Sequence, residues 1–383
     1  MAPDPRAGGV IDRARLARGG LYAGGFLGPF GGSVTSSMLP ELGGDFGVST
    51  SAASATITAY FVPFAVLMLF SGTLGARWGQ RRSVLGAYLV SVVGSALCAG
   101  ATVYPVLLAG RGVQGVANAF TTPLLLATIA ATTPRERLSR TLGWFASLQA
   151  AGQTSGPLVG GLAAEATWRL AFIGVAVAAG ALVVIGLPDV PERSRTEPAR
   201  LRSAWRPEVM RAAAVAFVGW GCLGGLTFLV AFRAEDGFGM SSSARGLLLT
   251  AFGVVGMLTA RFAGHVVERI GGRRGALLGA MAGALPIALI GVAPWVSAVG
   301  VLWAIGGFCA QFVQVGLNTL VLTSEENPAG AVSVVQAFRF IGASAAPIAF
   351  TPVYHLSPAL GFLLPALMLA VTPPVALLGK RWR

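Results

Sequence analysis

Charge is scarce in this sequence. Aspartate, glutamate, lysine and arginine together make up 11% of the 383 residues, whereas hydrophobic residues make up 54%. The mean hydropathy is +0.71. Soluble domains carry about 25% charged residues, because their surface faces water. The composition therefore excludes an ordinary soluble domain and indicates a protein whose surface faces lipid.

The residues that usually carry enzyme chemistry are also few. The chain has two histidines and three cysteines, and Cys98, Cys222 and Cys309 lie in different apolar segments without metal-ligand spacing. The sequence contains no Ser/His/Asp arrangement, paired carboxylates, HExxH motif or phosphate-binding glycine loop, and no ATP-binding module. We therefore expect no enzyme activity, metal, cofactor or disulfide. Any work must then draw on an ion or solute gradient, or on a partner.

Long apolar runs, by contrast, recur along the whole chain. Each has roughly 20 residues, enough to cross about 30 Å of hydrocarbon as a helix. We expect transmembrane helices near residues 20–40, 51–73, 83–101, 104–128, 141–163, 169–187, 210–232, 244–264, 275–293, 297–322, 329–353 and 357–379. The sequence thus predicts an all-α membrane protein with twelve transmembrane helices.

The net charge of +13 is explained by where the basic residues lie. If the N-terminus is cytoplasmic, 22 of the 28 basic residues fall in cytoplasmic segments, and only Arg169, Arg233 and Arg245 fall in outer ones. Under the positive-inside rule this predicts a multi-pass protein of the plasma membrane with both termini in the cytoplasm. The charge indicates a lipid bilayer as partner, not nucleic acid.

The two halves of the chain repeat one motif. Glycines and arginines between the second and third runs recur 192 residues later, between the eighth and ninth. The first set is Gly72, Arg77, Gly79, Arg81 and Arg82, and the second is Gly264, Arg269, Gly271, Arg273 and Arg274. This predicts two pseudo-symmetric six-helix bundles, residues 1–187 and 210–383, joined by a cytoplasmic linker at 188–209.

Polar side chains form stripes inside several apolar runs. In the fourth run the stripe is Arg111, Gln114, Asn118 and Thr122, which share one helix face. The tenth run has Gln311, Gln314 and Asn318, the fifth has Gln149 and Gln153, and the eleventh has Gln336 and Arg339. Polar groups facing lipid are unfavourable, so these stripes face either an aqueous cavity or a hydrogen-bonded seam between helices.

The fifth run also carries an unusual set of small residues. They are Gly152, Gly156, Pro157, Gly160 and Gly161, in the spacing GxxxGPxxGG. Glycines at this spacing give a smooth face for close packing of a neighbouring helix, and the proline bends the helix. Such residues are tolerated in the middle of a helix only where lipid and neighbouring helices hold it together.

These motifs together resemble the major facilitator superfamily, in particular its twelve-span drug:proton antiporters. The resemblance implies small-molecule efflux by alternating access, with the polar stripes lining a substrate cavity and the GPxxGG motif marking an antiporter. It also implies a cytoplasmic gate at Gly72, Arg77, Gly79, Arg81, Arg82, Gly264, Glu268, Arg269, Gly271 and Arg273. The family usually has an aspartate where this chain has Ala76, so the gate is expected to depend more on Glu268 and Arg269.

Proton coupling has no obvious carrier in the sequence, because all fifteen acidic residues lie in loops or near the ends of apolar runs. The candidates are therefore peripheral: Glu41, Asp45 and Glu165, with His265 and His355 behind them.

Two arginines, Arg111 and Arg339, lie deep in apolar runs that contain no acid. Either glutamines and backbone carbonyls satisfy these cations, or the cavity accepts an anionic group. This favours a neutral or anionic substrate over a lipophilic cation.

Two other functions stay open at this point. One is an uptake permease or proton symporter of the same fold for a sugar or organic acid, which the GPxxGG pattern disfavours. The other is a membrane receptor that transports nothing, which the regular motifs and polar stripes disfavour. We expect the protein to act as a monomer with a small-molecule substrate and protons as its partners.

Overall fold

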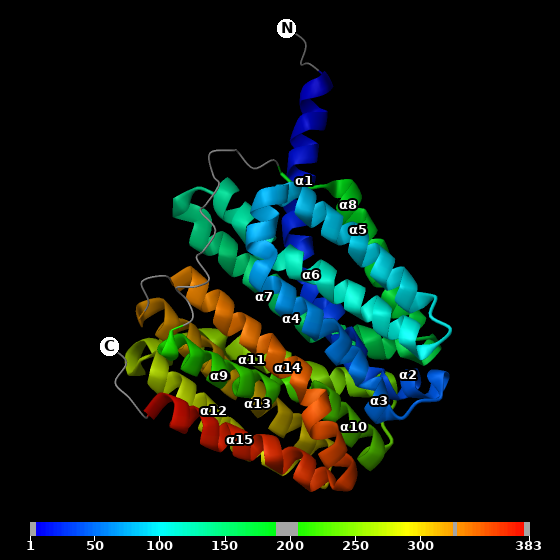
Figure 1. Ribbon diagram of the computed structural model, residues 1–383, viewed down its shortest axis with the longest axis vertical. Coiled ribbons are helices and arrows are strands. Elements are labelled where there is room, and N and C mark those ends of the chain that lie inside the picture. Colours follow the sequence, from blue (N-terminus) through cyan, green and yellow to red (C-terminus); the bar gives the residue numbers. More distant parts are fainter. Residues whose placement is uncertain (1–4, 189–205, 325–327, 379–383) are drawn as a thin grey trace.

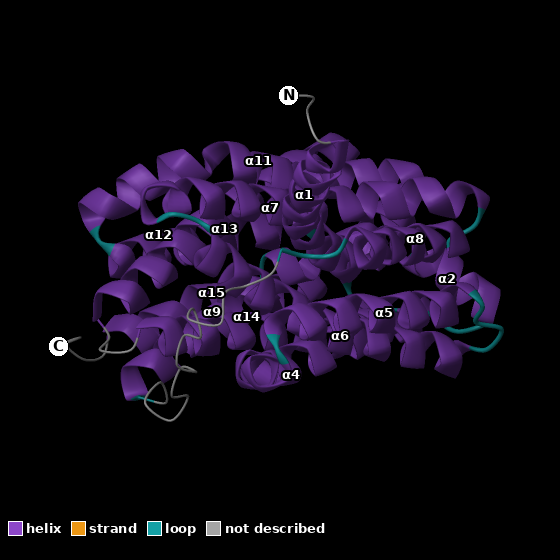
Figure 2. Ribbon diagram, turned by 90° about the horizontal axis from the view of Figure 1, so that it is seen from above, coloured by secondary structure: helices purple, strands orange, loops and turns teal. Residues whose placement is uncertain are grey.

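The computed structural model describes residues 5–188, 206–324 and 328–378, and the described chain is built from helices and loops alone (Figure 2). The long helices of the first half are α1 (Pro5–Ser33), α4 (Ala55–Trp78), α5 (Gln80–Ala99), α6 (Tyr104–Thr132), α7 (Arg135–Ala166) and α8 (Arg169–Ile185). Three short helices, η1 (Val34–Ser37), α2 (Leu39–Phe46) and α3 (Thr50–Ala53), join α1 to α4.

The second half has the same order of long helices. They are α9 (Pro207–Gly221), α10 (Thr227–Phe238), α11 (Ser242–Ile270), α12 (Gly272–Ile290), α13 (Val296–Ser324), α14 (Pro328–Leu356) and α15 (Pro358–Leu378), with η4 (Gly224–Leu226) between α9 and α10. Each of the twelve predicted runs coincides with one helix or with such a broken pair. The linker predicted at 188–209 falls mainly on 189–205, outside the described residues.

Eight helices or helix pairs of the described chain are long and apolar enough to cross a membrane, and α8 is a shorter apolar helix. Large apolar side chains point outward from both halves: Val184 is 88% exposed, Leu258 74% and Val375 73%. A surface of this kind is stable against lipid but not against water. The fold is therefore that of a helical membrane protein.

The runs 20–40 and 210–232 are not continuous helices as predicted. The first breaks after Ser33, whose hydroxyl donates to the carbonyls of Pro29 (3.1 Å) and Phe30 (3.3 Å). Such side-chain bonds compete with the helical backbone ladder. The second breaks at Gly224 and Gly225, where glycine weakens the helix. Both breaks lie in the first helix of a half, so they follow the internal repeat.

The repeated loop motif has a conformational basis. Gly79 joins α4 to α5 with φ 91°, and Gly271 joins α11 to α12 with φ 87°. Residues that carry a side chain rarely adopt a positive φ, whereas glycine adopts it freely. The repeat in the sequence is thus a repeat of the same tight junction in the structure.

The two halves lie one against the other, with α5, α6 and α8 of the first half above α9, α12 and α15 of the second in Figure 1. Helix α7 packs along α11, and α4 packs along α14. The phenyl ring of Phe340 on α14 lies 4.6 Å from the ring of Phe64 and 5.9 Å from that of Phe61, both on α4. The candidate site therefore lies between and beside these four helices.

Candidate transport site

The two ends of the molecule have different polar groups. We call the end with the α4–α5 and α11–α12 junctions the basic end, and the other end, where α11 begins, the Arg245 end. The contacts between the two halves differ at these ends.

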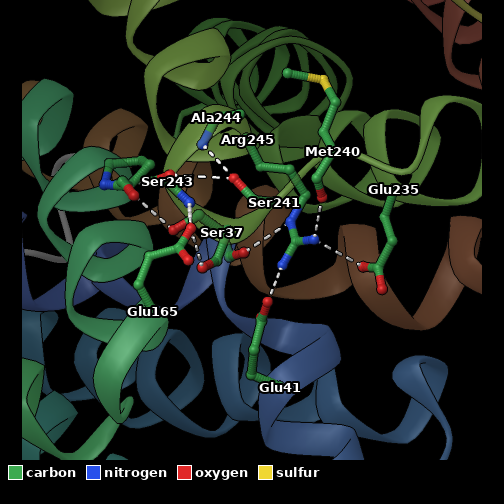
Figure 3. A network of polar contacts seen from close by, with 11 residues as sticks. Ser37, Glu41, Glu165, Glu235, Met240, Ser241, Ser243, Ala244 and Arg245 are labelled. Atoms are coloured by element: carbon green, nitrogen blue, oxygen red, sulfur yellow. Dashed lines mark hydrogen bonds and ion pairs between the residues drawn. The ribbon is translucent and has the colours of Figure 1, made fainter.

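Arg245 connects the two halves at its end of the molecule (Figure 3). Its side chain is 3% exposed and forms ion pairs with Glu41 of α2 and with Glu235 of α10, the second at 3.3 Å. Its Nε donates to the carbonyl of Ser37 (3.1 Å), and its Nη1 donates to the carbonyl of Met240 (2.8 Å). One buried guanidinium thus joins η1 and α2 of the first half to α10 and α11 of the second.

Further bonds close the same end. The Glu165 carboxylate at the end of α7 accepts from the backbone N–H of Ser243 (3.1 Å) and the hydroxyl of Ser242 (3.3 Å). On the other side of the molecule, the Thr58 hydroxyl of α4 donates to the carbonyl of Ser344 on α14 (2.8 Å). The halves are therefore held together at the Arg245 end along both of their contacts.

The predicted cytoplasmic gate lies at the basic end. Arg77, Arg82, Glu268 and Arg269 are exposed. Arg81 donates from Nε to the carbonyl of Leu187 within its own half (3.2 Å). Gly72 and Gly264 lie inside α4 and α11, and Arg273 is half-buried at the start of α12. Between the described side chains of this gate, no ion pair joins the two halves. The gate assignment stays a prediction.

The glycine motif of α7 makes close helix contacts on two sides, one within its own half and one with the other half. Gly152, Gly156 and Gly160 face α1 and η1, Gly161 faces α11, and Pro157 lies between them. A methyl group at Gly160 would overlap the carbonyl oxygen of Val34, and one at Gly161 would overlap that of Ser242. The Ser37 hydroxyl also donates to the carbonyl of Pro157 (2.5 Å). Only glycine permits this approach on two sides of α7.

Arg111 is fully buried in the first half, where its donors are mostly taken up by the protein. Nε donates to the carbonyl of Thr56 (3.3 Å), and Nη1 donates to the carbonyl of Gly31 (2.9 Å) and to Oε1 of Gln114 (2.7 Å). Nε2 of Gln114 in turn donates to the Ser95 hydroxyl (2.7 Å). These four bonds form a seam between α1, α4, α5 and α6.

The rest of the first-half stripe is also bonded within the protein. Nη2 of Arg111 has no acceptor, and its guanidinium lies 4.4 Å from the ring centre of Tyr60. Asn118 accepts from the Thr121 hydroxyl (2.8 Å). Tyr60, Gln114, Asn118 and Thr121 line a pocket inside the bundle.

Three of the remaining glutamines lie on or beside α7. Nε2 of Gln149 donates to the Thr122 hydroxyl of α6 (3.4 Å), Gln153 is half-buried one turn further on, and Gln311 of α13 lies against α11 at Gly256. They border the region where α7 packs along α11.

In the second half, the surroundings of Arg339 differ from those of Arg111. Its guanidinium lies 3.5 Å from the ring centre of Trp220, and its Nε is buried without a hydrogen-bond acceptor. The two residues line a pocket with Gln314, Asn318 and Gln336. The three amides have no hydrogen-bond partner within the described chain. The polar groups of this pocket are therefore free to bind a ligand.

Two of the candidate proton carriers are ionised and bonded. Trp168 Nε1 donates to the Asp45 carboxylate (2.8 Å), and Arg169 pairs with it (3.0 Å). These bonds, the indole first, lower the pKa of Asp45. Hydrogen bonds from Ser243 likewise lower the pKa of Glu165. Both carboxyls thus stay charged at neutral pH, which favours an anchoring role for them.

Glu41 differs from these two, because its second oxygen, Oε2, is buried without a donor. Of the histidines, His265 is exposed beside Arg261, and the ring of His355 lies 6.1 Å from that of Phe232. Of the three candidate carboxyls, Glu41 is therefore the one with a buried oxygen that no described donor occupies.

Sequence reasoning placed Arg245 only as an outer-side arginine and assigned Glu235 no role. A signal was available, because a basic residue on the side that carries few of them needs a reason to be there. Its partners at positions 37, 41, 235 and 240 are separated by up to 208 residues from Arg245 in the chain, so only the fold brings them together.

Two helical bundles tied at one end, with unpaired polar groups in an internal pocket and an apolar exterior, define a multi-pass membrane transporter. A family model described as the Major Facilitator Superfamily matches residues 21–347. The chain belongs to the major facilitator superfamily. This confirms the predicted all-α membrane fold and the prediction that the protein is a transporter and not an enzyme.

Relatives and a solved structure agree with this placement. The chain is 33% identical over 161 residues to the MFS-type transporter EfpA of Mycobacterium tuberculosis, which covers 42% of this chain and 30% of the relative. It is 31% identical over 154 residues to the methylenomycin A resistance protein of Bacillus subtilis, covering 39% and 33%. The matched part thus spans about a third of these relatives' length.

The fold is similar to that of the human organic anion transporter MFSD10 (TETRAN), whose crystal structure superposes with a TM-score of 0.69 at 17% identity. The superposition covers 95% of this chain and 99% of that one. At this identity the likeness concerns the fold alone.

Proposed function

We propose that this transporter exports a small organic molecule across the plasma membrane in exchange for protons, by alternating access. The basic end faces the cytoplasm, and both termini lie there. Among the relatives is a protein named for resistance to methylenomycin A, which supports export as the direction of transport.

The observation that carries the proposal is the packing of the α7 motif. Its glycines hold α7 against α1 and against α11 at once, so the motif lies in the contact between the two halves. A smooth contact of this kind lets the halves rock while it keeps the Arg245 end tight against leak. With that end closed, export requires that the pocket around Arg339 is reached from the cytoplasm.

We assign the proton-coupled step to Glu41. Opening the Arg245 end would separate Glu41 from Arg245, because the two residues belong to different halves. A carboxylate that loses its cation partner binds a proton more readily. Protons arriving from outside would then meet Glu41 when that end opens.

The test uses everted membrane vesicles with an acidic lumen, a pH-sensitive dye and labelled solutes. Cationic, neutral and anionic lipophiles are added in turn, with empty-vector vesicles and the Glu41→Gln variant as controls. Export predicts that a substrate accumulates in the lumen and releases protons from it, and that Glu41→Gln loses the proton release.

Other results would contradict the proposal in different ways. A proton symporter for uptake would move labelled solute out of the lumen together with protons. A receptor would move no solute at all. Proton release that persists in Glu41→Gln would overturn the role assigned to that residue, but not export itself.

A further inference from the structure

Arg339 is a half-buried cation without a counter-ion among the described residues. Its guanidinium lies over the ring of Trp220 at 3.5 Å and 5.4 Å from the ring centre of Phe340. No ion pair joins it to a carboxylate in the part of the chain that the structure describes, and its Nε has no acceptor. A ring face stabilises a cation only partly, so the environment of Arg339 lacks an anion.

The wall around Arg339 is suited to a molecule with one polar end. The amides of Gln314, Asn318 and Gln336 line one part of the pocket. Apolar side chains line the rest, among them Leu223 and Leu317. Amides donate to oxygen atoms, and the apolar wall accepts a hydrocarbon body.

The first half of the molecule supplies an internal comparison. Arg111 is bonded to two backbone carbonyls and to Gln114, so the protein satisfies most of its donors. The same residue type thus has a structural role in one half. Arg339 has no such bonds, and a structural role does not explain it.

The internal repeat leads to the same conclusion. One repeat length after Arg111 stands Trp303, whose Nε1 donates to the carbonyl of Leu249 (3.2 Å), just as Nε of Arg111 donates to that of Thr56. The counterpart of the structural arginine is therefore a tryptophan. Between α7 and α14 the repeat length is 190 residues, since Gly152 and Gly342 pack in the same way on the carbonyls of Phe26 and Phe217. The position equivalent to Arg339 is therefore Gln149, so the charge belongs to the second half only.

We propose that Arg339, with the amides of Gln314, Asn318 and Gln336, binds the carboxylate of a small organic acid whose apolar body lies against Leu223 and Leu317. The guanidinium forms charge-assisted hydrogen bonds with the carboxylate, for which a planar fork is the best donor. The inference rests on the proposed function, because it takes this pocket as part of the transport pathway. It names the substrate class as organic monocarboxylates.

The test measures binding to the purified full-length protein by isothermal titration calorimetry, without any proton gradient. Three probes share one body and differ only in the head group: 4-tert-butylbenzoate, 4-tert-butylbenzyl alcohol and 4-tert-butylbenzylammonium. The wild type is expected to bind the benzoate about tenfold or more tightly than either other probe.

The variants separate the subsite from general effects. Arg339→Gln is expected to lose the preference for the benzoate, and Arg339→Lys to keep part of it. Arg261→Gln is the matched control, because Arg261 is an exposed arginine on α11 away from the pocket, and it keeps the preference in full. If Arg339→Gln fails to fold, Asn318→Ala takes its place and is expected to weaken benzoate binding selectively.

Equal binding of the three probes would overturn the inference, as would an unchanged preference in Arg339→Gln or, in its place, in Asn318→Ala. Failure of the inference and failure of the proposed function are distinguishable. Benzoate binding without proton release in vesicles would leave the subsite and remove the coupling. Proton release triggered by cationic lipophiles alone would leave export and remove the carboxylate subsite.

Discussion

At the scale of single residues, two arginines in the predicted membrane interior have opposite surroundings. Arg111 donates to Gly31, Thr56 and Gln114, whereas Arg339 has no hydrogen-bond partner in the described part of the chain and lies on Trp220. Arg111 satisfies backbone carbonyls in the protein interior. The charge of Arg339 has no counter-ion among the described residues until a ligand binds. Their effects on stability must therefore differ.

We expect Arg111→Met to lower the free energy of unfolding by about 1–3 kcal/mol, because it leaves buried acceptors without donors. Arg339→Met is expected to leave stability unchanged or to raise it, since it removes a half-buried charge that has no counter-ion among the described residues. Thermal unfolding of both purified variants in one detergent is the measurement. Equal losses of stability in the two variants would contradict the assigned roles.

Asp45 gives a prediction about pH. Trp168 and Arg169 lower its pKa in the folded protein, so the charged form is stabilised by folding. This contribution is complete above the unfolded value, about pH 4, and is lost as the pH falls through the lower folded value. The stability difference between the wild type and Asp45→Asn should therefore be constant from pH 7 down to about 4 and shrink below it.

Thermal unfolding of the wild type and Asp45→Asn across this range tests the prediction. Thr167→Ala is a useful reference, since it changes a neighbouring polar residue without removing a charge. A difference that grows as the pH falls would mean that folding raises the pKa of Asp45 instead.

At the scale of helices, hydropathy predicted where the chain crosses the membrane but not where a crossing breaks. Mean hydropathy reports composition, and both 20–40 and 210–232 are predominantly apolar. The breaks at η1 and η4 depend on the Ser33 hydroxyl and on the glycine pair at 224–225. Of the short helices, α2 lies mostly outside the apolar runs, and α3 falls at the start of the run 51–73, so the same analysis could not separate α3 from α4.

Helix packing gives a prediction at Gly160. An added methyl group would meet the backbone carbonyl of Val34, which cannot move aside without shifting η1. We expect Gly160→Ala to destabilise the protein by about 1–3 kcal/mol through overpacking and to reduce export. The matched control is Gly174→Ala on α8, where an added methyl group would meet nothing within 4 Å.

Thermal unfolding and the flux of labelled solute into everted vesicles should be measured on both variants. If Gly160→Ala and Gly174→Ala behave alike, close packing of α7 on η1 does not matter for transport.

At the scale of the whole molecule, the sequence predicted two bundles but not which end is tied. The repeated Gly/Arg loop showed the pseudo-symmetry through local spacing alone. The Arg245 cluster instead combines residues from both halves, and no spacing rule relates Glu41 to Glu235. For the same reason, the sequence could not separate the seam around Arg111 from the open pocket around Arg339.

The tied end supplies the last prediction. Alternating access requires the Arg245 end to open in each cycle, so a covalent bond across it must stop transport. The hydroxyl oxygens of Ser54 on the first half and Thr351 on the second lie 3.5 Å apart. Cysteines at these two positions are close enough for a disulfide. The three native cysteines are buried, so they offer little competition for a water-soluble oxidant.

We expect oxidation of the double variant Ser54→Cys, Thr351→Cys to block export and a reductant to restore it, while each single variant stays active under both conditions. Cross-linking is checked by electrophoresis after cleavage between the halves. Full export by the cross-linked protein would mean that this end stays closed throughout the cycle. The Arg245 cluster would then be a fixed brace, and Glu41 could not receive protons in the way proposed. Block and recovery would make the cluster a gate that opens once per transport event.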